Sequence, residues 1–291
     1  MPLDVAAEVL SNTRLSPDYN VLGLAAPEIA AAAAPGQFLM LKTGDRLEPL
    51  LRRPFSVFEI LKQDGRINGL SVLNKRIGPS TRLLFEARPG DRVQCLGPLG
   101  RPFVPVSPPD EAWLVAGGVG LAPFATLAEA LRSRGTHVRL YYGARSGAEL
   151  FFLEEFTRLG VELHLATEDG SRGERGRVTV PLERDLGDVR LQPESAVRLK
   201  PESEVRLKPD ATSAAGIMVY ACGPEPMLAA VAKLAAAHGR QSQVSVERVM
   251  GCGLGGCYSC VIPIRTAGGA PHYVRSCIAG PTFRGDEIEW Q

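Results

Sequence analysis

Near its C-terminus the chain carries the stretch Gly251-Cys252-Gly253-Leu254-Gly255-Gly256-Cys257-Tyr258-Ser259-Cys260, and a further cysteine follows at Cys277. The spacing C-x4-C-x2-C with another cysteine downstream is typical of a plant-type 2Fe-2S cluster, which is held by thiolates. Glycines suit such a loop because it must turn tightly and bring its backbone close to sulfide. The sequence therefore predicts an iron–sulfur site, with its ligands at Cys252, Cys257, Cys260 and Cys277.

Zinc and disulfide bonds are the alternatives for these cysteines. Structural zinc sites use two C-x2-C pairs or add histidine, whereas this tract has a single such pair, and His272 lies nearer to the last cysteine. Disulfide bonds are typical of secreted proteins, and nothing in the sequence indicates secretion. Outside the tract, Cys95 and Cys222 are expected to be small, partly buried side chains.

Length and charge limit the function further. The 291 residues allow two or three domains, and the formal net charge of +1 gives no basic excess for nucleic acid or an anionic membrane surface. The N-terminus has no secretory leader, and no apolar run reaches the roughly 18 residues of a membrane-spanning helix. We therefore expect a cytoplasmic protein that binds small molecules or another protein, with no nucleic acid and no membrane.

The first part of the chain, residues 1–107, contains short strand-like runs broken by Pro-Gly and Asp-Gly turn signals. Such spacing predicts a small antiparallel barrel or sandwich. One helix is expected at about residues 80–85. The predicted strands cover residues 21–24, 37–41, 55–58, 70–73 and 92–96.

The middle part, residues 108–240, alternates strands with helices. A strand at 113–116 leads into Gly117-Gly118-Val119-Gly120 and a helix at 124–132. This layout presents backbone N–H groups and a positive helix end to a phosphate, although any α/β domain can contain such a turn. The alternation predicts a parallel sheet. Its further strands are expected at 138–145, 161–166 and 217–222, and its further helices at 151–159 and 227–238.

A repeat interrupts this pattern. Residues 188–215 contain three eight-residue copies that each end in proline, which prevents a long helix. We predict an inserted, solvated loop, with an interaction arm as the alternative. The last part, residues 241–291, is expected to form strands at 243–248, 260–264 and 272–276 around the cysteine loop.

Three motifs in this order resemble the ferredoxin reductase family of flavoproteins: Arg53-Pro54-Phe55-Ser56 as R-x-[YF]-S, the glycine turn, and Cys222-Gly223-Pro224 as C-G-P. The resemblance implies that Arg53 binds the FAD diphosphate, that Pro54 and Phe55 pack on the flavin, and that Ser56 faces its N5 edge. A guanidinium suits a diphosphate, and a hydride-accepting nitrogen needs a hydrogen-bond partner. Without the other motifs, the arginine pair would be an ordinary surface feature.

The same resemblance implies further cofactor contacts. Leu73, Asn74 and Lys75 correspond to a strand along the flavin, and Ser80-Thr81 to a helix start that faces phosphate, with Ser80 where glycine is usual. Tyr142-Gly143-Ala144-Arg145 corresponds to Y-G-x-R beside the nicotinamide nucleotide. Gly117, Gly118, Val119 and Gly120 would contact the nucleotide, and Cys222, Gly223 and Pro224 would lie beside the nicotinamide ring without implying catalytic cysteine chemistry.

Over nearly the whole chain, the order of parts resembles the electron-transfer subunits of NAD-linked dihydroorotate dehydrogenases. Their pattern E-x-x-M-x-C-G-x-G-x-C-x-x-C is matched from Glu247 to Cys260, although Ala279 stands where aspartate is usual. The resemblance implies a multidomain β and α/β fold. Its parts would be an FAD-binding β-barrel at 1–107, a Rossmann-like NAD-binding domain at 108–240 and a 2Fe-2S domain at 241–291.

The implied activity is an electron relay in pyrimidine biosynthesis. Electrons would pass from the FMN of a partner that oxidises dihydroorotate, through the cluster and FAD, to NAD+, in a heterotetramer of two plus two subunits. Similar subunits serve ferredoxin:NADP+ oxidoreductases and sulfhydrogenases, and a cofactor-free interaction protein is a third possibility. The complete set of cysteines favours the first. NAD versus NADP stays open, and the loop 252–260 is expected to face the partner.

Overall fold

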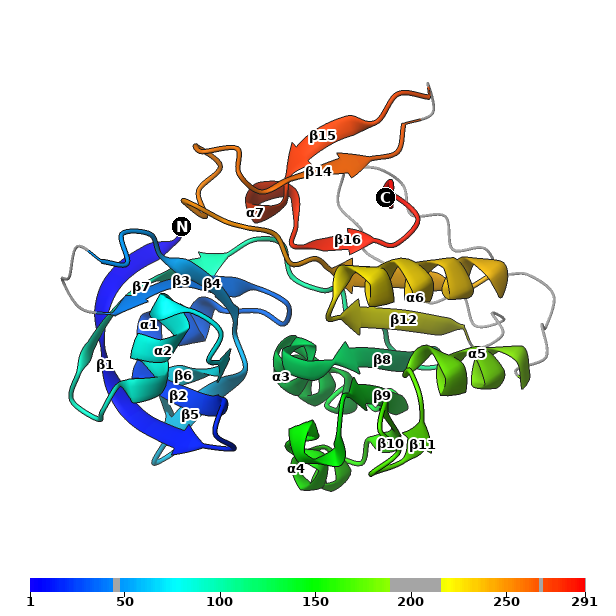
Figure 1. Cartoon of the computed structure of the whole chain (residues 1–291), viewed down its shortest axis with the longest axis horizontal. Coiled ribbons are helices and arrows are strands. Elements are labelled where there is room, and N and C mark those ends of the chain that lie inside the picture. The colour runs from blue at the N-terminus through cyan, green and yellow to red at the C-terminus, as the bar shows by residue number, and fades with distance from the viewer. Residues whose placement is uncertain (44–47, 189–215, 267–268, 291) are drawn as a thin grey trace.

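The computed structural model describes residues 1–43, 48–188, 216–266 and 269–290. The chain forms a barrel, an α/β layer structure and a C-terminal module that lies across both, drawn in blue to cyan, green to yellow and orange to red (Figure 1). The predicted inserted loop, beyond its first residue, lies outside the described residues.

The barrel is a sheet of seven antiparallel strands in the order β4-β3-β7-β1-β2-β6-β5. The edge strands β4 and β5 follow each other in the chain. Of the two residues between them, Val57 donates its N–H to the Gln37 carbonyl next to β3, and Phe58 donates its N–H to the Ser71 carbonyl of β6. The sheet therefore curls into the barrel that the turn signals predict. Its strands are β1 (Leu3–Arg14), β2 (Tyr19–Ala25), β3 (Phe38–Thr43), β4 (Arg53–Ser56), β5 (Glu59–Gln63), β6 (Arg66–Lys75) and β7 (Arg92–Leu99).

Two short helices pack on the barrel, α1 (Pro27–Ala32) and α2 (Pro79–Glu86). The second is the helix expected at about residues 80–85. Asn12 donates to the carbonyls of Phe85 and Ala87 at the end of α2, at 3.0 and 2.7 Å. A polar side chain of β1 therefore closes the helix end inside the barrel wall, where the unpaired carbonyls of a helix need donors.

The α/β part is a second seven-stranded sheet, in the order β11-β10-β9-β8-β12-β13-β16. All its neighbours are parallel except the antiparallel pair β13 and β16. Its strands are β8 (Glu111–Gly117), β9 (Val138–Ala144), β10 (Glu162–Thr167), β11 (Glu174–Arg175), β12 (Ile217–Cys222), β13 (Gln241–Ser245) and β16 (Thr282–Arg284).

Helices cover both faces of this sheet. One apolar cluster contains residues of α3 (Ala122–Arg132) and α4 (Leu153–Arg158), and another contains residues of α5 (Thr179–Asp188) and α6 (Glu225–Ala237). Strands buried on both faces have continuous apolar runs, and the parallel sheet that the strand–helix alternation predicts is present. The short 3-10 helices Gly118–Leu121 and Gly147–Glu149 lie in the turns.

The C-terminal part does not separate from this sheet at residue 241. Strand β13 continues the parallel sheet after α6, and β16 returns beside it. Between them, β14 (Val261–Ile264) and β15 (His272–Arg275) form a hairpin and α7 (Ser276–Ala279) follows. The three-domain division thus stays a prediction, but its last boundary falls inside a sheet, because the α6–β13 connection adds one more parallel strand.

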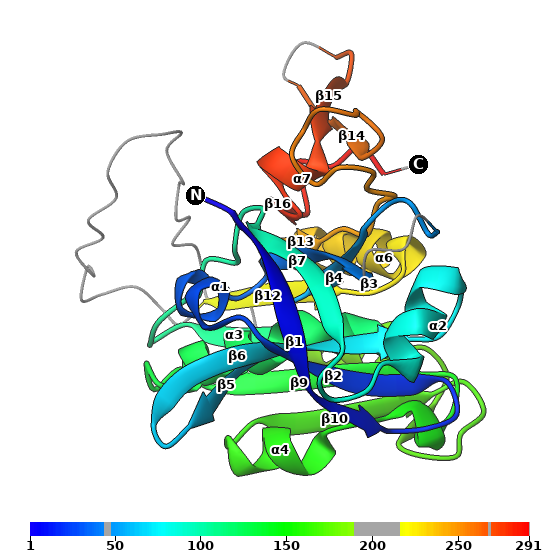
Figure 2. The same cartoon turned by 90° about the vertical axis from the view of Figure 1, so that its left-hand side faces the viewer.

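The three parts share apolar contacts. Tyr19 and Phe58 of the barrel lie 5.1 and 4.8 Å, between ring centroids, from Phe151 and Phe152 of the α/β part. A second cluster joins the barrel to the C-terminal module and consists of Phe38, Met40, Leu96, Leu99, Met250, Cys260 and Cys277. In side view the module stands over one end of the barrel and the sheet (Figure 2). Among the described residues, no helix has the length and apolarity to span a bilayer.

Candidate functional site

The predicted cluster ligands lie together in two pairs. Cys252 and Cys257 interact with each other, as do Cys260 and Cys277, and Cys252 also lies close enough to Cys277 to influence its charge. The pairs differ in burial: Cys257 is exposed and Cys252 half-buried, whereas Cys260 and Cys277 are 2% and 1% exposed. The structure thus brings all four predicted thiols into one site.

Glycines allow the loop to lie against its neighbours. Gly253 and Gly255 have φ values of +73° and +80°, a region that side chains strongly disfavour. A Cβ on Gly253 would lie 2.6 Å from Cγ of Met40, and one on Gly255 would lie 2.8 Å from Cγ1 of Ile278. These two positions therefore need glycine both for conformation and for close approach.

Hydrogen-bond donors surround the outer pair of thiols. The Leu254 N–H points at the Cys252 sulfur at 3.4 Å. The Ser259 hydroxyl lies 3.1 Å from the Cys257 sulfur and accepts from the Gly251 N–H at 2.9 Å. The hydrogen bond with Ser259 lowers the pKa of the Cys257 thiol to about 6, so this side chain favours the thiolate that iron requires.

Burial dominates at the inner pair. Burial and, to a lesser degree, the neighbouring Cys260 raise the pKa of the Cys277 thiol to about 12, against a hydrogen bond from the Gly255 backbone that lowers it. Such a thiol becomes a thiolate only when a cation compensates its charge, because an isolated charge is costly in an apolar site. The inner pair therefore suits a buried metal centre.

The donor set fits a 2Fe-2S cluster. Among the described residues, no three His, Cys, Asp or Glu side chains converge on one metal position. A two-iron cluster needs only two thiolates at each iron, which is how the thiols are arranged. The positive-φ glycines and the N–H groups aimed at sulfur form the tight, donor-rich cradle that such a cluster requires.

Strand β4 places the R-P-F-S motif next to the strand that supports the cysteine loop. Pro54 pairs with Met40 of β3 in the sheet register, and Met40 lies in the apolar cluster with Cys260 and Cys277. The site predicted to bind flavin and the cysteine site thus lie on adjacent strands of one sheet.

The two arginines of this motif differ. Arg52 is paired with Asp4 at 2.9 Å. Arg53 is exposed and donates to the carbonyls of Leu51 and Arg52, and within the described parts of the chain no carboxylate lies within ion-pair distance of it. Arg53 therefore keeps its charge available for an anion, as a diphosphate site requires.

The predicted flavin strand divides its side chains between two faces. Asn74 is fully buried and donates to Asn20 at 2.8 Å and to the Thr81 carbonyl at 3.0 Å. Leu73 packs in a cluster with Ala122 at the contact between the barrel and the α/β part. The Lys75 ammonium lies 4.9 Å from the ring centroid of Tyr19, so Lys75 and the backbone remain as the accessible groups of this segment.

Ser80 and Thr81 open helix α2 as expected. The Thr81 hydroxyl accepts from the Ile77 and Gly78 N–H groups, each at 2.9 Å, and Ser80 is buried. Thr81 therefore fixes the loop before the helix, and that loop presents the helix start to solvent at Ile77, which is exposed.

The glycine turn packs on the C-G-P corner. A Cβ on Gly120 would lie 2.1 Å from the carbonyl oxygen of Cys222, and one on Gly117 would lie 2.9 Å from Cδ of Pro224. Only Gly118, with φ +55°, faces open space. Gly117 and Gly120, two of the predicted nucleotide contacts, thus let the glycine turn pack closely on the C-G-P corner. Gly118, at the start of the helical segment, leaves room for a ligand.

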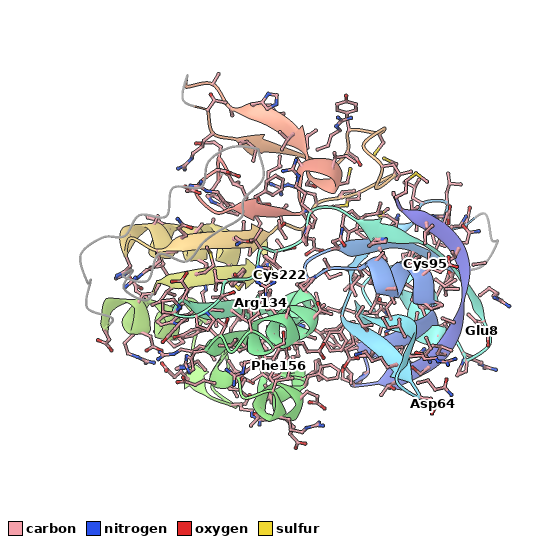
Figure 3. All side chains as sticks on the ribbon, turned by 180° about the vertical axis from the view of Figure 1, so that it is seen from behind. Glu8, Asp64, Cys95, Arg134, Phe156 and Cys222 are labelled. Carbon is pink, nitrogen blue, oxygen red and sulfur yellow. The ribbon has the colours of Figure 1, made fainter. Side chains whose placement is uncertain are left out.

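Cys222 ends strand β12 close to the middle of the molecule, whereas Cys95 lies within the barrel (Figure 3). Burial raises the pKa of the Cys222 thiol to about 12, against a hydrogen bond with Ser245. At neutral pH such a thiol is protonated and a weak nucleophile, and the place of Cys222 beside the nicotinamide ring stays a prediction.

Two contacts of the site were not among the predictions from the sequence. Arg248, four residues before the first cluster cysteine, pairs with Glu225 through both terminal guanidinium nitrogens, Nη1 and Nη2, with Nη2 at 2.7 Å from Oε1. Arg275 donates to the Gly255 carbonyl at 2.7 Å. A sequence signal for Arg275 is its position two residues before the last cluster cysteine.

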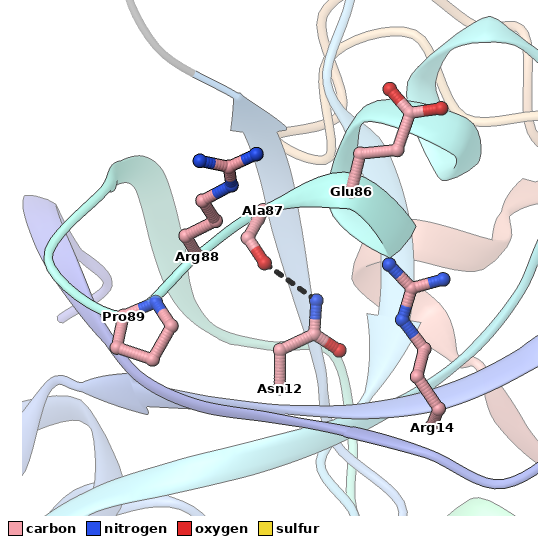
Figure 4. Close-up of a pocket in the computed structure, with 6 residues that line it drawn as sticks. All are labelled: Asn12, Arg14, Glu86, Ala87, Arg88 and Pro89. Atoms are coloured by element: carbon pink, nitrogen blue, oxygen red, sulfur yellow. Dashed lines mark hydrogen bonds between the residues drawn. The ribbon is translucent and has the colours of Figure 1, made fainter.

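A cavity of about 480 Å3 lies elsewhere, at the C-terminal end of α2. Figure 4 shows its polar wall, in which the Asn12 amide already bonds to the Ala87 carbonyl. It is at the opposite end of the helix from Ser80, so it is separate from the predicted phosphate contact.

Known proteins match this chain over most of its length. The iron–sulfur cluster binding domain of dihydroorotate dehydrogenase B matches residues 247–289, and the oxidoreductase NAD-binding domain matches residues 114–233. The electron transfer subunit of dihydroorotate dehydrogenase B (NAD+) of Desulforamulus reducens is 32% identical over 98% of both chains. That of Geobacillus kaustophilus is 37% identical over 87% of this chain and 86% of its own.

Solved structures agree with the fold. An NADH-dependent reduced ferredoxin-NADP oxidoreductase structure superposes with a TM-score of 0.77 at 25% identity, covering 98% of this chain and 90% of the other. A ferredoxin NADP+ reductase from Neisseria gonorrhoeae, with bound FAD and NADP, gives a TM-score of 0.59 at 20% identity, covering 81% and 92%.

Fold and site together define an oxidoreductase with a ferredoxin reductase-like barrel, an NAD-binding sheet and a C-terminal iron–sulfur module. Within this class, the chain belongs to the family of electron transfer subunits of dihydroorotate dehydrogenase B (NAD+). The predicted fold class, family and oxidoreductase class are confirmed.

Proposed function

We propose that this chain passes electrons between a dihydroorotate-oxidising partner subunit and NAD, as the names of its relatives indicate for them. The observation that carries the proposal is the placement of two adjacent thiol pairs against β3, next to the strand with the R-P-F-S motif. The two predicted cofactor sites then lie on adjacent strands of one sheet, and electron transfer requires such proximity.

The predicted cofactor set of a 2Fe-2S cluster, FAD and NAD is supported by the matched domains and relatives. When bound, the cluster supplies single-electron steps and the flavin couples them to the two-electron chemistry of nicotinamide. In our proposal Cys252 and Cys257 hold one iron, and Cys260 and Cys277 hold the other.

We assign the flavin contacts to the barrel. Arg53, free of a carboxylate partner in the described chain, binds the diphosphate. Pro54, Phe55 and Ser56 are half-buried on an edge strand, where they can cover a planar ring and leave the hydroxyl beside it. The remaining contacts come from Lys75, from the backbone of Leu73 and Asn74, and from the helix start at Ser80 and Thr81, which the Asn74 side chain supports from inside the barrel wall.

We assign NAD to the turn of Gly117, Gly118, Val119 and Gly120 and to the corner of Cys222, Gly223 and Pro224. The open space at Gly118 admits a phosphate, and φ +152° at Gly223 turns the chain at the end of β12. The neutral Cys222 thiol is a small side chain beside the ring, and its function is to leave space for it.

The partner is proposed to be an FMN-containing catalytic subunit in a two-plus-two complex in the cytoplasm. Exposed apolar side chains surround the cysteine loop: Val249, Leu254, Tyr258 and Ile278 are 82%, 54%, 62% and 49% exposed. Such an apolar group beside the thiols supports the expectation that the loop 252–260 faces the partner.

The test uses the full chain, reconstituted anaerobically with iron, sulfide and FAD. We expect flavin and iron–sulfur absorption, two irons per flavin, and oxidation of NADH with an artificial acceptor. Co-expressed with its partner, it should reduce NAD+ with dihydroorotate. A colourless folded preparation, or one that binds only zinc, would refute the proposal.

A second candidate rests on the similarity to the NADH-dependent ferredoxin-NADP oxidoreductase structure, which spans 98% of this chain. A subunit of that type, or of a sulfhydrogenase, would hold the same cofactors and use another partner. Reduced ferredoxin, NADH and NADP+, supplied to the purified complex in place of dihydroorotate and NAD+, separate the two: reduction of NADP+ in this mixture without turnover of dihydroorotate would favour the second candidate.

A further inference from the structure

The C-terminal module has four arginines, and three of them have carboxylate partners. Arg248 pairs with Glu225, Arg265 with Glu289 at 2.8 Å, and Arg284 with Asp286. Arg275 differs from them: within residues 1–43, 48–188, 216–266 and 269–290, no carboxylate lies within ion-pair distance of its guanidinium. Its charge is half-buried and lacks a counterion in the described chain.

The Arg275 side chain turns toward the cysteine loop. It is the last residue of β15, opposite Val261, and it precedes the last cluster cysteine by two residues. Its Nη1 donates to the Gly255 carbonyl at 2.7 Å, and its guanidinium carbon lies 4.8 Å from the ring centroid of Tyr258. Arg275 therefore contacts the cysteine loop at two residues, Gly255 and Tyr258.

One of these residues is directly connected to a cluster ligand. Gly255 accepts from Arg275 through its carbonyl, and its own N–H donates to the Cys277 sulfur. A single residue thus separates the guanidinium from the inner pair of thiols. Fixing the Gly255 peptide fixes the donor at that sulfur, and hydrogen bonds to sulfur are among the factors that set the potential of an iron–sulfur cluster.

The positive charge of Arg275 also affects the reduction potential of a bound cluster. A cluster held by thiolates is negatively charged and gains one more negative charge on reduction. A nearby cation without a counterion stabilises the reduced form more than the oxidised form, and a partly buried position limits its screening by solvent.

We propose that Arg275 is a positioning residue that holds the Gly255 peptide against Cys277 and raises the reduction potential of the cluster through its unpaired charge. The inference rests on the proposed function, because it requires a cluster at the four thiols. It adds a residue that tunes how readily electrons enter the chain.

The experiment is a redox titration of the reconstituted full chain, followed by electron paramagnetic resonance of the reduced cluster. Three variants are compared: Arg275→Gln removes the charge, Arg275→Lys keeps it without the planar fork, and Arg265→Gln removes a paired charge from the other end of the same hairpin. For Arg275→Gln we expect the oxidised-to-reduced ratio at a fixed solution potential to rise roughly tenfold, or about 59 mV for one electron. Arg275→Lys should shift less, and Arg265→Gln should not shift.

An unchanged potential in an Arg275→Gln protein with full iron content would overturn the inference. If that variant holds no cluster, an Arg275→Lys protein with a cluster near the wild-type potential supports a requirement for the charge, whereas loss of the cluster from both variants overturns it. A wild-type chain without a cluster refutes the proposed function instead, so the two failures are distinguishable.

Discussion

The two thiol pairs share one chemistry and have opposite surroundings. Cys257 lies at the surface of a glycine loop, where the Ser259 hydroxyl lowers its pKa to about 6. Cys260 and Cys277 are buried against Phe38 and Met40 of the barrel, and burial raises the pKa of Cys277 to about 12. In the outer pair, local hydrogen bonds favour the thiolate that binds a metal. In the inner pair, packing between distant parts of the chain creates a buried site in which a thiolate needs a metal to compensate its charge.

In the proposed relay, the two pairs would face different neighbours. The outer pair lies among exposed apolar side chains, where a partner can approach, and the inner pair contacts the strand beside the R-P-F-S motif. If the two pairs differ in this way, iron binding at the inner pair should depend on packing against the barrel, and substitutions at the outer pair should affect only the cysteine loop.

The largest effect is expected from removing an inner thiol. Cys277→Ala should retain on the order of a tenth or less of the wild-type iron, because Cys277 is only 1% exposed and its thiolate is difficult for water to replace there. Cys257→Ala should retain more, since Ser259 and water can supply an oxygen ligand at the exposed position. Iron and sulfide analysis with electron paramagnetic resonance measures both.

Flavin content is the control for this pair of variants, and we expect it to stay at the wild-type level in both. Equal loss of iron from Cys257→Ala and Cys277→Ala would contradict the distinction between inner and outer thiols.

The next effect comes from the barrel side of the contact. Met40 is fully buried, so Met40→Ala should lower the free energy of unfolding by about 2–5 kcal/mol and also reduce cluster content. Leu22→Ala is the matched control, because Leu22 is equally buried but belongs to the barrel core away from the module. Denaturant titration measures stability, and iron analysis measures the cluster.

The control should lose similar stability and keep its iron. If both variants lost iron in proportion to stability, the packing of Met40 on the module would have no specific effect on the cluster.

Much of this arrangement could be predicted from the sequence, since the cysteine spacing, the strand–turn–helix signals and the apolar runs are local. The direction in which individual side chains point could not be predicted. The motif around Asn74 does not show which side of β6 faces inward, and the structure turns Asn74 into the barrel wall toward Asn20. Strand β16 pairs with β13 in a sheet whose first strand, β8, begins 171 residues earlier. This pairing forms only because the C-terminal module folds back onto the sheet. Pairs such as Arg248–Glu225 likewise depend on distant packing.

A smaller effect is expected inside the loop. Gly255→Ala must adopt φ +80° and displace Ile278, which should cost about 1–2 kcal/mol in the free energy of unfolding. Gly256 is the matched control, because its Cβ would meet nothing within 4 Å. Gly256→Ala should change stability by less than about 0.5 kcal/mol. Denaturant titration of both variants makes the comparison, and equal losses would show that the loop is strained as a whole.

The smallest effect concerns the pair that anchors the start of the loop. The Arg248 guanidinium lowers the pKa of Glu225, so the pair stabilises the fold above the unfolded pKa of about 4.5 and loses that stabilisation as the pH falls through the lower, folded value. Because the Glu225 side chain is 43% exposed, we discount the gain for screening to about 0.5–1 kcal/mol. Arg248→Gln should remove it, so in urea titrations wild type and variant differ at pH 7 and converge as the pH falls through the lowered folded pKa of Glu225. A difference that persisted in acid would show that Arg248 acts through packing rather than charge.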